Sequence, residues 1–325
     1  MPDPAVPTVA SLTARNSAGH TRIHIAAKNG ELGSLPREAL TAKYLTIRND
    51  AGYTPLHHAA IGGHLDQVPA EVLTTENLSI RSNAGFSVFH TAAAHGNLGQ
   101  IPPDLMTAEV FQSGNDTGNT ILHEAAEHGT LDRVPPGYLT AEYVARRNLS
   151  GETVLHVAAF NGHLDQVPAE LLSAEALRET TSSGDTVFHA AAISGHLEQV
   201  PRDLLVFENL SVPSKTGFTP THAAAETGQL NKIPAAQLTA QLLVIRNDNG
   251  DTPLHAAAFE GHLDQVPAEL LTAERVGTRN YDGVSVARLA MERGFITQIP
   301  EASRPKAFGA VSRLLRRISR TRTPF

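Results

Sequence analysis

The stretch Gly52-Tyr53-Thr54-Pro55-Leu56-His57-His58-Ala59-Ala60 decides the fold, because variants of it recur along the chain. Its glycine returns in eight successive steps of 33 residues without an insertion. The nine positions are Gly19, Gly52, Gly85, Gly118, Gly151, Gly184, Gly217, Gly250 and Gly283. Thr or Ser stands two residues after each glycine, and His stands five residues after it in all units except the last, which has Arg288. A fixed period of this length marks a repeat architecture.

Each position of the repeat has a physical interpretation. The first glycine fits a tight turn that needs a positive φ. The Thr or Ser, as at Thr54, is a good N-cap, and Pro55 suits the first turn of a helix. A second glycine, such as Gly63, is typical of a helix C-terminus. We therefore predict one helix of about ten residues per unit, which must stack on its neighbours because it cannot bury a face alone.

The residues from Gly52 to Ala60, repeated from Gly250 to Ala258 and continued in Gly63-His64-Leu65 and Gly261-His262-Leu263, resemble the ankyrin repeat. The resemblance covers residues 16–300. It implies an all-α, ankyrin-like repeat solenoid of about nine 33-residue units joined by short turns. It also implies that the His of the Thr-x-x-His stretch is structural, with its imidazole hydrogen-bonded within the turn.

The second half of each unit departs from the family pattern, which has a continuous second helix there. This chain instead reads Leu-Asp-Gln-Val-Pro-Ala-Glu-Leu-Leu-Thr-Ala-Glu, as at 263–274. Proline occupies one position in all nine units: Pro36, Pro69, Pro102, Pro135, Pro168, Pro201, Pro234, Pro267 and Pro300. Because proline is unfavourable inside a helix, we expect a loose turn before it and a helix restart with proline near the first helical position. A second restart is expected at the following Thr or Ser, such as Thr272.

The predicted organisation has three parts. Residues 1–15 form an N-terminal half-repeat cap, residues 16–303 form the array, and residues 304–325 form a basic, amphipathic C-terminal helix or tail. That last segment carries seven basic residues and no acid, which leaves 19 basic and 33 acidic residues, a net charge of −14, for the rest. It caps the last repeat, contacts an anionic membrane or nucleic acid, or folds onto the acidic repeats. The residues for the second role are Arg313, Arg316, Arg317 and Arg320.

Composition limits the kinds of functional site and the cellular compartments that are compatible with this sequence. The 325 residues include no Cys and no Trp. The absence of Cys excludes disulfides, thiolate metal sites and cysteine nucleophiles. No apolar run approaches 18 residues, and the first residues lack a secretory signal. We expect a cytoplasmic protein, although export by a non-classical route leaves no mark in a sequence.

Function is expected where the repeat varies. Positions just after the first glycine and after the alanine pair differ between units, and in ankyrin proteins the matching positions form the concave binding surface. The apolar residues there are predicted to bind a partner: Tyr53, Ile61, Phe86, Phe160, Ile193, Phe218 and Phe259. The alternative is that the altered second half of each unit buries them.

Histidine-rich repeats also raise the question of metal binding. The stretch from His123 to His128 resembles a zinc-protease helix, but its histidines are five residues apart rather than four, and Glu124 and Glu127 fall in variable columns expected at the surface. We therefore predict no metal, no cofactor and no catalytic residue. The expected function is a non-catalytic protein–protein interaction scaffold, monomeric, whose partner carries a basic surface.

Overall fold

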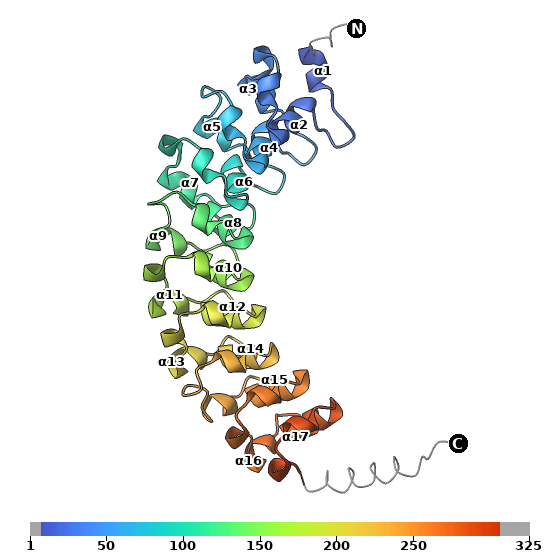
Figure 1. Ribbon diagram of the computed structural model, residues 1–325, viewed down its shortest axis with the longest axis vertical. Coiled ribbons are helices and arrows are strands. Elements are labelled where there is room, and N and C mark those ends of the chain that lie inside the picture. The colour runs from blue at the N-terminus through green and yellow to red at the C-terminus, as the bar shows by residue number, and fades with distance from the viewer. Residues whose placement is uncertain (1–7, 306–325) are drawn as a thin grey trace, which may run out of the picture. The chain divides into compact units, whose positions relative to one another are not determined.

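The computed structural model describes residues 8–305, and the chain divides into two compact units between Ala176 and Leu177. Within residues 8–305 the regular elements are all helical, and pairing of extended backbone is limited to isolated bridges such as Arg147 with Thr153. Figure 1 shows the helices of each unit following one another in sequence order. The predicted all-α repeat solenoid is confirmed.

Every repeat contains one helix of seven or eight residues, which we call the repeat helix. In the first compact unit, which ends at Ala176, these are α2 (Arg22–Asn29), α4 (Pro55–Gly62), α6 (Val88–Ala94), α8 (Ile121–His128) and α10 (Val154–Asn161). In the second unit they are α12 (Val187–Ser194), α14 (Pro220–Glu226), α15 (Pro253–Glu260) and α17 (Val286–Glu292). The helices are shorter than the predicted ten residues because Thr or Ser caps the start and a left-handed glycine, such as Gly63, follows the end so closely.

Shorter helices form a second row in each unit (Figure 1). They are α1 (Val9–Thr13), α3 (Ala42–Leu45), α5 (Thr75–Leu78), α7 (Ala108–Gln112) and α9 (Ala141–Val144), then α13 (Phe207–Leu210) and α16 (Ala273–Val276). The short helix α11 (Ala174–Arg178) contains the boundary between the units. Most begin at the predicted Thr or Ser, and the Thr74 side chain, for example, accepts a hydrogen bond from the backbone N–H of Asn77.

One-turn 3-10 helices join the two rows. A first set follows the repeat helices: η1 (Leu32–Ser34), η3 (Leu65–Gln67), η4 (Leu98–Gln100), η6 (Leu131–Arg133), η7 (Leu164–Gln166), η9 (Leu197–Gln199), η11 (Leu230–Lys232), η13 (Leu263–Gln265) and η15 (Ile296–Gln298). A second set comprises η2 (Arg37–Ala39), η5 (Pro103–Leu105), η8 (Ala169–Leu171), η10 (Arg202–Leu204), η14 (Ala268–Leu270) and η16 (Glu301–Ser303). In one repeat η12 (Leu242–Val244) takes the place of the short helix of the second row.

Where a helix restarts after the proline of a repeat, the proline lies near the first helical position, as expected, but one residue before it. Pro168 has an extended backbone, with φ −52° and ψ 133°, and precedes η8 as its N-cap instead of occupying the first helical position. The preceding turn, η7, ends at Gln166, so the chain between the two turns is extended. The same N-cap position is held by Pro36, Pro102, Pro201, Pro267 and Pro300, whereas Pro69, Pro135 and Pro234 precede turns. Neither position costs a helical hydrogen bond, which explains how proline is tolerated in every repeat.

The core lies between the rows of helices. Leu56, Ala59 and Ala60 of α4 are fully buried, and so is Leu65, which begins the following turn. The alanine pair brings neighbouring repeat helices close together, since larger side chains would hold the helices apart. The hydrophobic stabilisation is therefore spread along each unit, with every repeat contributing a similar share.

Histidines tie each repeat to the next. Nδ1 of His57 accepts a hydrogen bond from the backbone N–H of Thr54 at 3.1 Å, and Nε2 donates to the carbonyl oxygen of Phe86, 29 residues later, at 3.0 Å. Because a carbonyl only accepts, the ring is the neutral tautomer with its proton on Nε2. The structural role predicted for these histidines is confirmed. The same bond to the next repeat is made by His24, His57, His90, His123, His189, His222 and His255.

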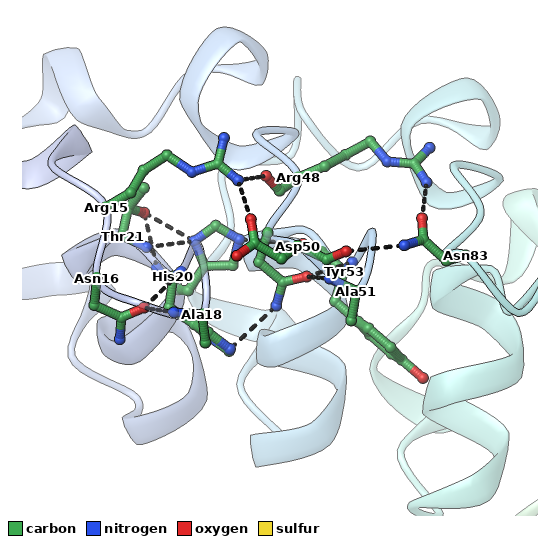
Figure 2. A network of polar contacts seen from close by, with 12 residues as sticks. Arg15, Asn16, Ala18, His20, Thr21, Arg48, Asp50, Ala51, Tyr53 and Asn83 are labelled. Carbon is green, nitrogen blue, oxygen red and sulfur yellow. Dashed lines mark hydrogen bonds and ion pairs between the residues drawn. The ribbon is translucent and has the colours of Figure 1, made fainter.

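The loops that enter the repeat helices also connect neighbouring repeats, and we call them turn loops (16–20, 49–53 and their equivalents). Figure 2 shows Asn16 Oδ1 accepting from the backbone N–H groups of Ala18 and His20. Between loops, Arg15 reaches Asp50 at 3.1 Å, and Asn83 Nδ2 donates to the carbonyl oxygen of Asp50 at 2.9 Å. The first glycine of each repeat has the predicted positive φ.

Two further predictions concern membrane-spanning helices and the basic C-terminal segment. Among residues 8–305, no helix combines the length and the apolar character needed to cross a bilayer. The basic segment predicted to cap the array or contact an anionic surface, with Arg313, Arg316, Arg317 and Arg320, lies outside the described residues.

Two glycines of the first repeat provide a matched pair for testing the helix ends. Gly30 has φ +73°, and a Cβ there would lie 2.8 Å from Cε1 of His64, whereas a Cβ on Gly33 would meet no atom within 4 Å. Gly30→Ala should lower the free energy of unfolding by about 1–2 kcal/mol or more, because it combines left-handed backbone with a clash. Gly33→Ala should leave it unchanged or raise it by about 0.4–1 kcal/mol. Urea unfolding of both variants tests this, and equal effects would contradict it.

The buried histidines predict how stability depends on pH. Burial lowers the pKa of His24, His57, His90, His123 and His222 to about 4. The unfolded chain, with histidine pKa values near 6.5, therefore binds more protons between pH 6.5 and 4 than the folded chain does. The free energy of unfolding should be at its full value above pH 6.5 and fall as the pH drops to 4. Thermal melts across this range measure it, and stability that stays constant down to pH 4 would contradict the prediction.

Candidate functional site

A groove of ≈ 630 Å³ lies in the first unit. One end is apolar and is lined by Tyr53, Ile61 and Phe86. The other end is polar and acidic. Its lining includes Asn115, Asn119, Glu124, Glu127, His128, Asn148 and Glu152, and no lysine or arginine is among the described residues that line the groove. The groove therefore combines an apolar end with an end of negative potential.

The turn loops hold one wall of this groove. Tyr53, Phe86, Asn119 and Glu152 occupy the same position in four successive repeats, directly after the first glycine. The carbonyl oxygen of each accepts the hydrogen bond from the preceding repeat's histidine, at 3.0–3.1 Å. The stacking contact that builds the array thus also fixes the backbone from which these four side chains project.

Glu124 is the most unusual residue of the groove. It is only 1% exposed, although it was expected at the surface, because it lies on α8 directly after His123 and faces the turn loops. Its Oε1 accepts hydrogen bonds from the side-chain amides of Asn115 at 3.0 Å and Asn119 at 3.2 Å. Burial raises the pKa of Glu124 to about 7, even though these two hydrogen bonds favour the charged form.

The second unit contains a smaller groove, of ≈ 390 Å³. Phe218 and Phe259 line it together with acidic residues, and its described lining again contains no lysine or arginine. The acidic residues are Glu226, Asp251, Glu260 and Asp282. The guanidinium carbon of Arg293 lies 3.4 Å from the centre of the Phe259 ring, so a cation already occupies one face of this aromatic residue.

The seven predicted binding residues lie in three different places: the first groove, the second groove and the surface outside both. Tyr53, Ile61 and Phe86 line the groove of the first unit, and Phe218 and Phe259 line that of the second. Phe160 and Ile193 line neither groove, and they are 52% and 44% exposed. Whether these seven residues bind a partner stays a prediction.

Sequence reasoning selected only the apolar residues of the variable positions as binding residues, and it expected Glu124 at the surface. The position after each repeat-helix histidine, which Ile25, His58, Thr91, Glu124 and Val157 occupy in the first compact unit, was not selected for binding. A single glutamate in that column was the signal available. His123 itself is structural, since its Nδ1 accepts from Thr120 N–H and its Nε2 bonds to Glu152.

The raised pKa of Glu124 predicts a pH-dependent gain from removing its charge. The folded chain holds a proton on Glu124 between pH 4.5 and 7 that the unfolded chain has lost, so this residue destabilises the fold increasingly as the pH rises through that window. Glu124→Gln should therefore raise the free energy of unfolding by about 1–3 kcal/mol at pH 8, and by little at pH 4.5. Urea unfolding at both pH values measures this. The exposed Glu127→Gln is the control, and an equal gain at both pH values for Glu124→Gln would contradict the prediction.

Comparison with known proteins supports the assignment made from the repeat pattern. Residues 249–277, which include α15 and α16, match the family model described as Ankyrin repeat. No curated protein matches the chain. The remaining repeats share the capped helix and the left-handed glycines of the matched segment, and all except the last, which has Arg288, share its histidine. Residues 249–277 are therefore similar to the ankyrin repeat family, and the other repeats keep the same 33-residue pattern.

Proposed function

We propose that this protein binds a partner protein through the grooves of its repeat units, and that the bound segment of the partner combines apolar side chains with lysine or arginine. Ankyrin repeats generally mediate protein–protein interaction and are typically not catalytic. The observation that carries the proposal is the composition of the grooves, in which aromatic and acidic residues meet and the described lining contains no lysine or arginine.

The apolar end of the first groove would supply the binding energy. Tyr53, Ile61 and Phe86 are half-buried, so they are partly exposed to solvent before a partner arrives. The Tyr53 ring packs edge-on against His57 at 5.2 Å, which holds it in place, and an anchor held in this way loses little freedom on binding. Burying such aromatic and aliphatic surface is the usual source of affinity at interfaces.

The acidic end would set the specificity and the rate of association. Glu127 is exposed, and Glu152 is half-buried with its carboxylate bonded to Asn148 Nδ2 at 2.7 Å. These charges favour a lysine or arginine and oppose an acidic segment, and their attraction acts before contact. The net charge of −14 on residues 1–303 adds to this attraction for a basic partner.

Charge reversal in each groove tests the proposal. The full chain is used to select binders from a random peptide library, and the enriched peptides are expected to pair an apolar residue with lysine or arginine. Glu152→Lys should lower the affinity of peptides that bind the first groove at least tenfold, and Glu260→Lys should do the same for peptides that bind the second. A tenfold loss corresponds to about 1.4 kcal/mol of binding free energy. High salt should lower these affinities as well.

Glu109→Lys is the matched control. Glu109 is exposed on α7 and outside both grooves, so its reversal changes the net charge by the same amount without altering a groove. Affinity should stay within twofold of the unaltered chain. Binding that falls equally in all three variants would mean that overall charge alone attracts the peptides. Binding that persists in both groove variants would locate the site elsewhere.

A further inference from the structure

The polar end of the first groove brings three potential metal ligands together on one helix. Glu124, Glu127 and His128 are separated by three, four and one residues on α8, so the first lies on the same face as the other two. One ligand atom from each lies within 4.8 Å of the other two. All three residues line the groove, where a bound ion would remain accessible from solvent.

Glu124 presents one oxygen that other groups of the protein leave free. Both amide donors, from Asn115 and Asn119, bond to Oε1, and Oε2 accepts no hydrogen bond from the described residues. The residue is 99% buried and lines the groove. Oε2 is not among the fully buried unpartnered atoms of residues 8–305, so it reaches the solvent of the groove, where a cation could bind it.

A second layer of hydrogen bonds fixes the orientation of these donors. Oδ1 of Asn115 accepts from the backbone N–H groups of Thr117 and Asn119, both at 3.0 Å, so its amide nitrogen must face Glu124. Oδ1 of Asn119 accepts from Nδ2 of Asn148 at 3.0 Å, which orients the second amide in the same way. Metal ligands are commonly held by outer hydrogen bonds of this kind.

One hydrogen bond determines which ring nitrogen of His128 could bind a metal. Its Nδ1 lies 3.0 Å from the backbone carbonyl oxygen of Glu124, which can only accept, so Nδ1 carries the proton. In the neutral ring, the lone pair is then on Nε2. An imidazole whose Nδ1–H is bonded to a backbone carbonyl and whose Nε2 faces the ion is a recurrent arrangement of histidine ligands.

The combination is confined to one repeat. The preceding repeat has Thr91, Ala94 and His95 at the corresponding positions, and the following repeat has Val157, Phe160 and Asn161. His95 makes the same contact through Nδ1, to the Thr91 carbonyl oxygen at 2.9 Å, but no carboxylate stands beside it in its repeat. The repeat architecture therefore does not require the two glutamates, and it provides an internal control.

We propose that Glu124, Glu127 and His128 bind one zinc ion in the groove of the first unit. Two carboxylates and an imidazole form a donor set that zinc accepts, and three protein ligands leave a fourth position open toward the groove. Tetrahedral zinc with bonds of about 2.0–2.1 Å places its ligand atoms about 3.3 Å apart, so the exposed Glu127 and His128 would close by up to about 1.5 Å onto the fixed Glu124. This site differs from the zinc-protease pattern dismissed above, because His123 takes no part in it.

Titration calorimetry of the full chain with Zn²⁺ near neutral pH tests this assignment without a partner protein. The unaltered chain should bind one zinc ion at a site that Mg²⁺ does not fill, since imidazole is a poor ligand for Mg²⁺. Glu124→Gln and His128→Ala should each weaken this binding at least tenfold. His128 is exposed at the end of α8, so its variant is expected to fold.

His95→Ala is the matched control and should bind zinc as the unaltered chain does. Circular dichroism melts of each variant separate loss of the site from loss of the fold, and zinc should raise the melting temperature of the unaltered chain but not of His128→Ala. Unchanged zinc affinity in His128→Ala would overturn the proposal, as would an equal loss in His95→Ala. Because no partner is present, the outcome is independent of the peptide-binding experiment.

Discussion

The hydrogen bond from a buried imidazole to the turn loop of the next repeat is the contact on which the rest of the structure depends. It joins a helix N-terminus to a backbone carbonyl 29 residues later, as between His57 and Phe86. The ring must be neutral and in a single tautomer, because Nδ1 accepts within the repeat and Nε2 donates beyond it. Helix capping, loop position and repeat spacing are therefore set by one side chain per repeat.

The repeat positions could be predicted from sequence because each is fixed by local geometry. The Thr54 cap, the left-handed Gly63 and the bridging His57 follow from preferences that act within a few residues. The restart at Pro168 was expected near the first helical position, and the structure places proline there as the N-cap. The exact residue could not be predicted, because an extended N-cap and a first helical position both suit proline.

The grooves were less predictable, because they depend on which residues of different repeats meet. Tyr53 and Phe86 were identified as variable apolar residues, and they do line one groove, but nothing in the sequence separates them from Phe160, which lines neither. Glu124 was expected at the surface because charged residues are seldom buried. Its burial results from the amides of Asn115 and Asn119, whose positions are known only once the turn loops are folded.

The histidine contact also gives the array a direction. Each imidazole donates forward along the chain, and the backbone carbonyl that receives it lies in the following repeat. Removing repeats from the amino-terminal side leaves a carbonyl oxygen at the new end, which water can satisfy readily. Removing them from the carboxyl-terminal side leaves a largely buried N–H without its acceptor, which costs more. The two ends of such an array are therefore not equivalent as places to shorten it, even though every repeat has the same length.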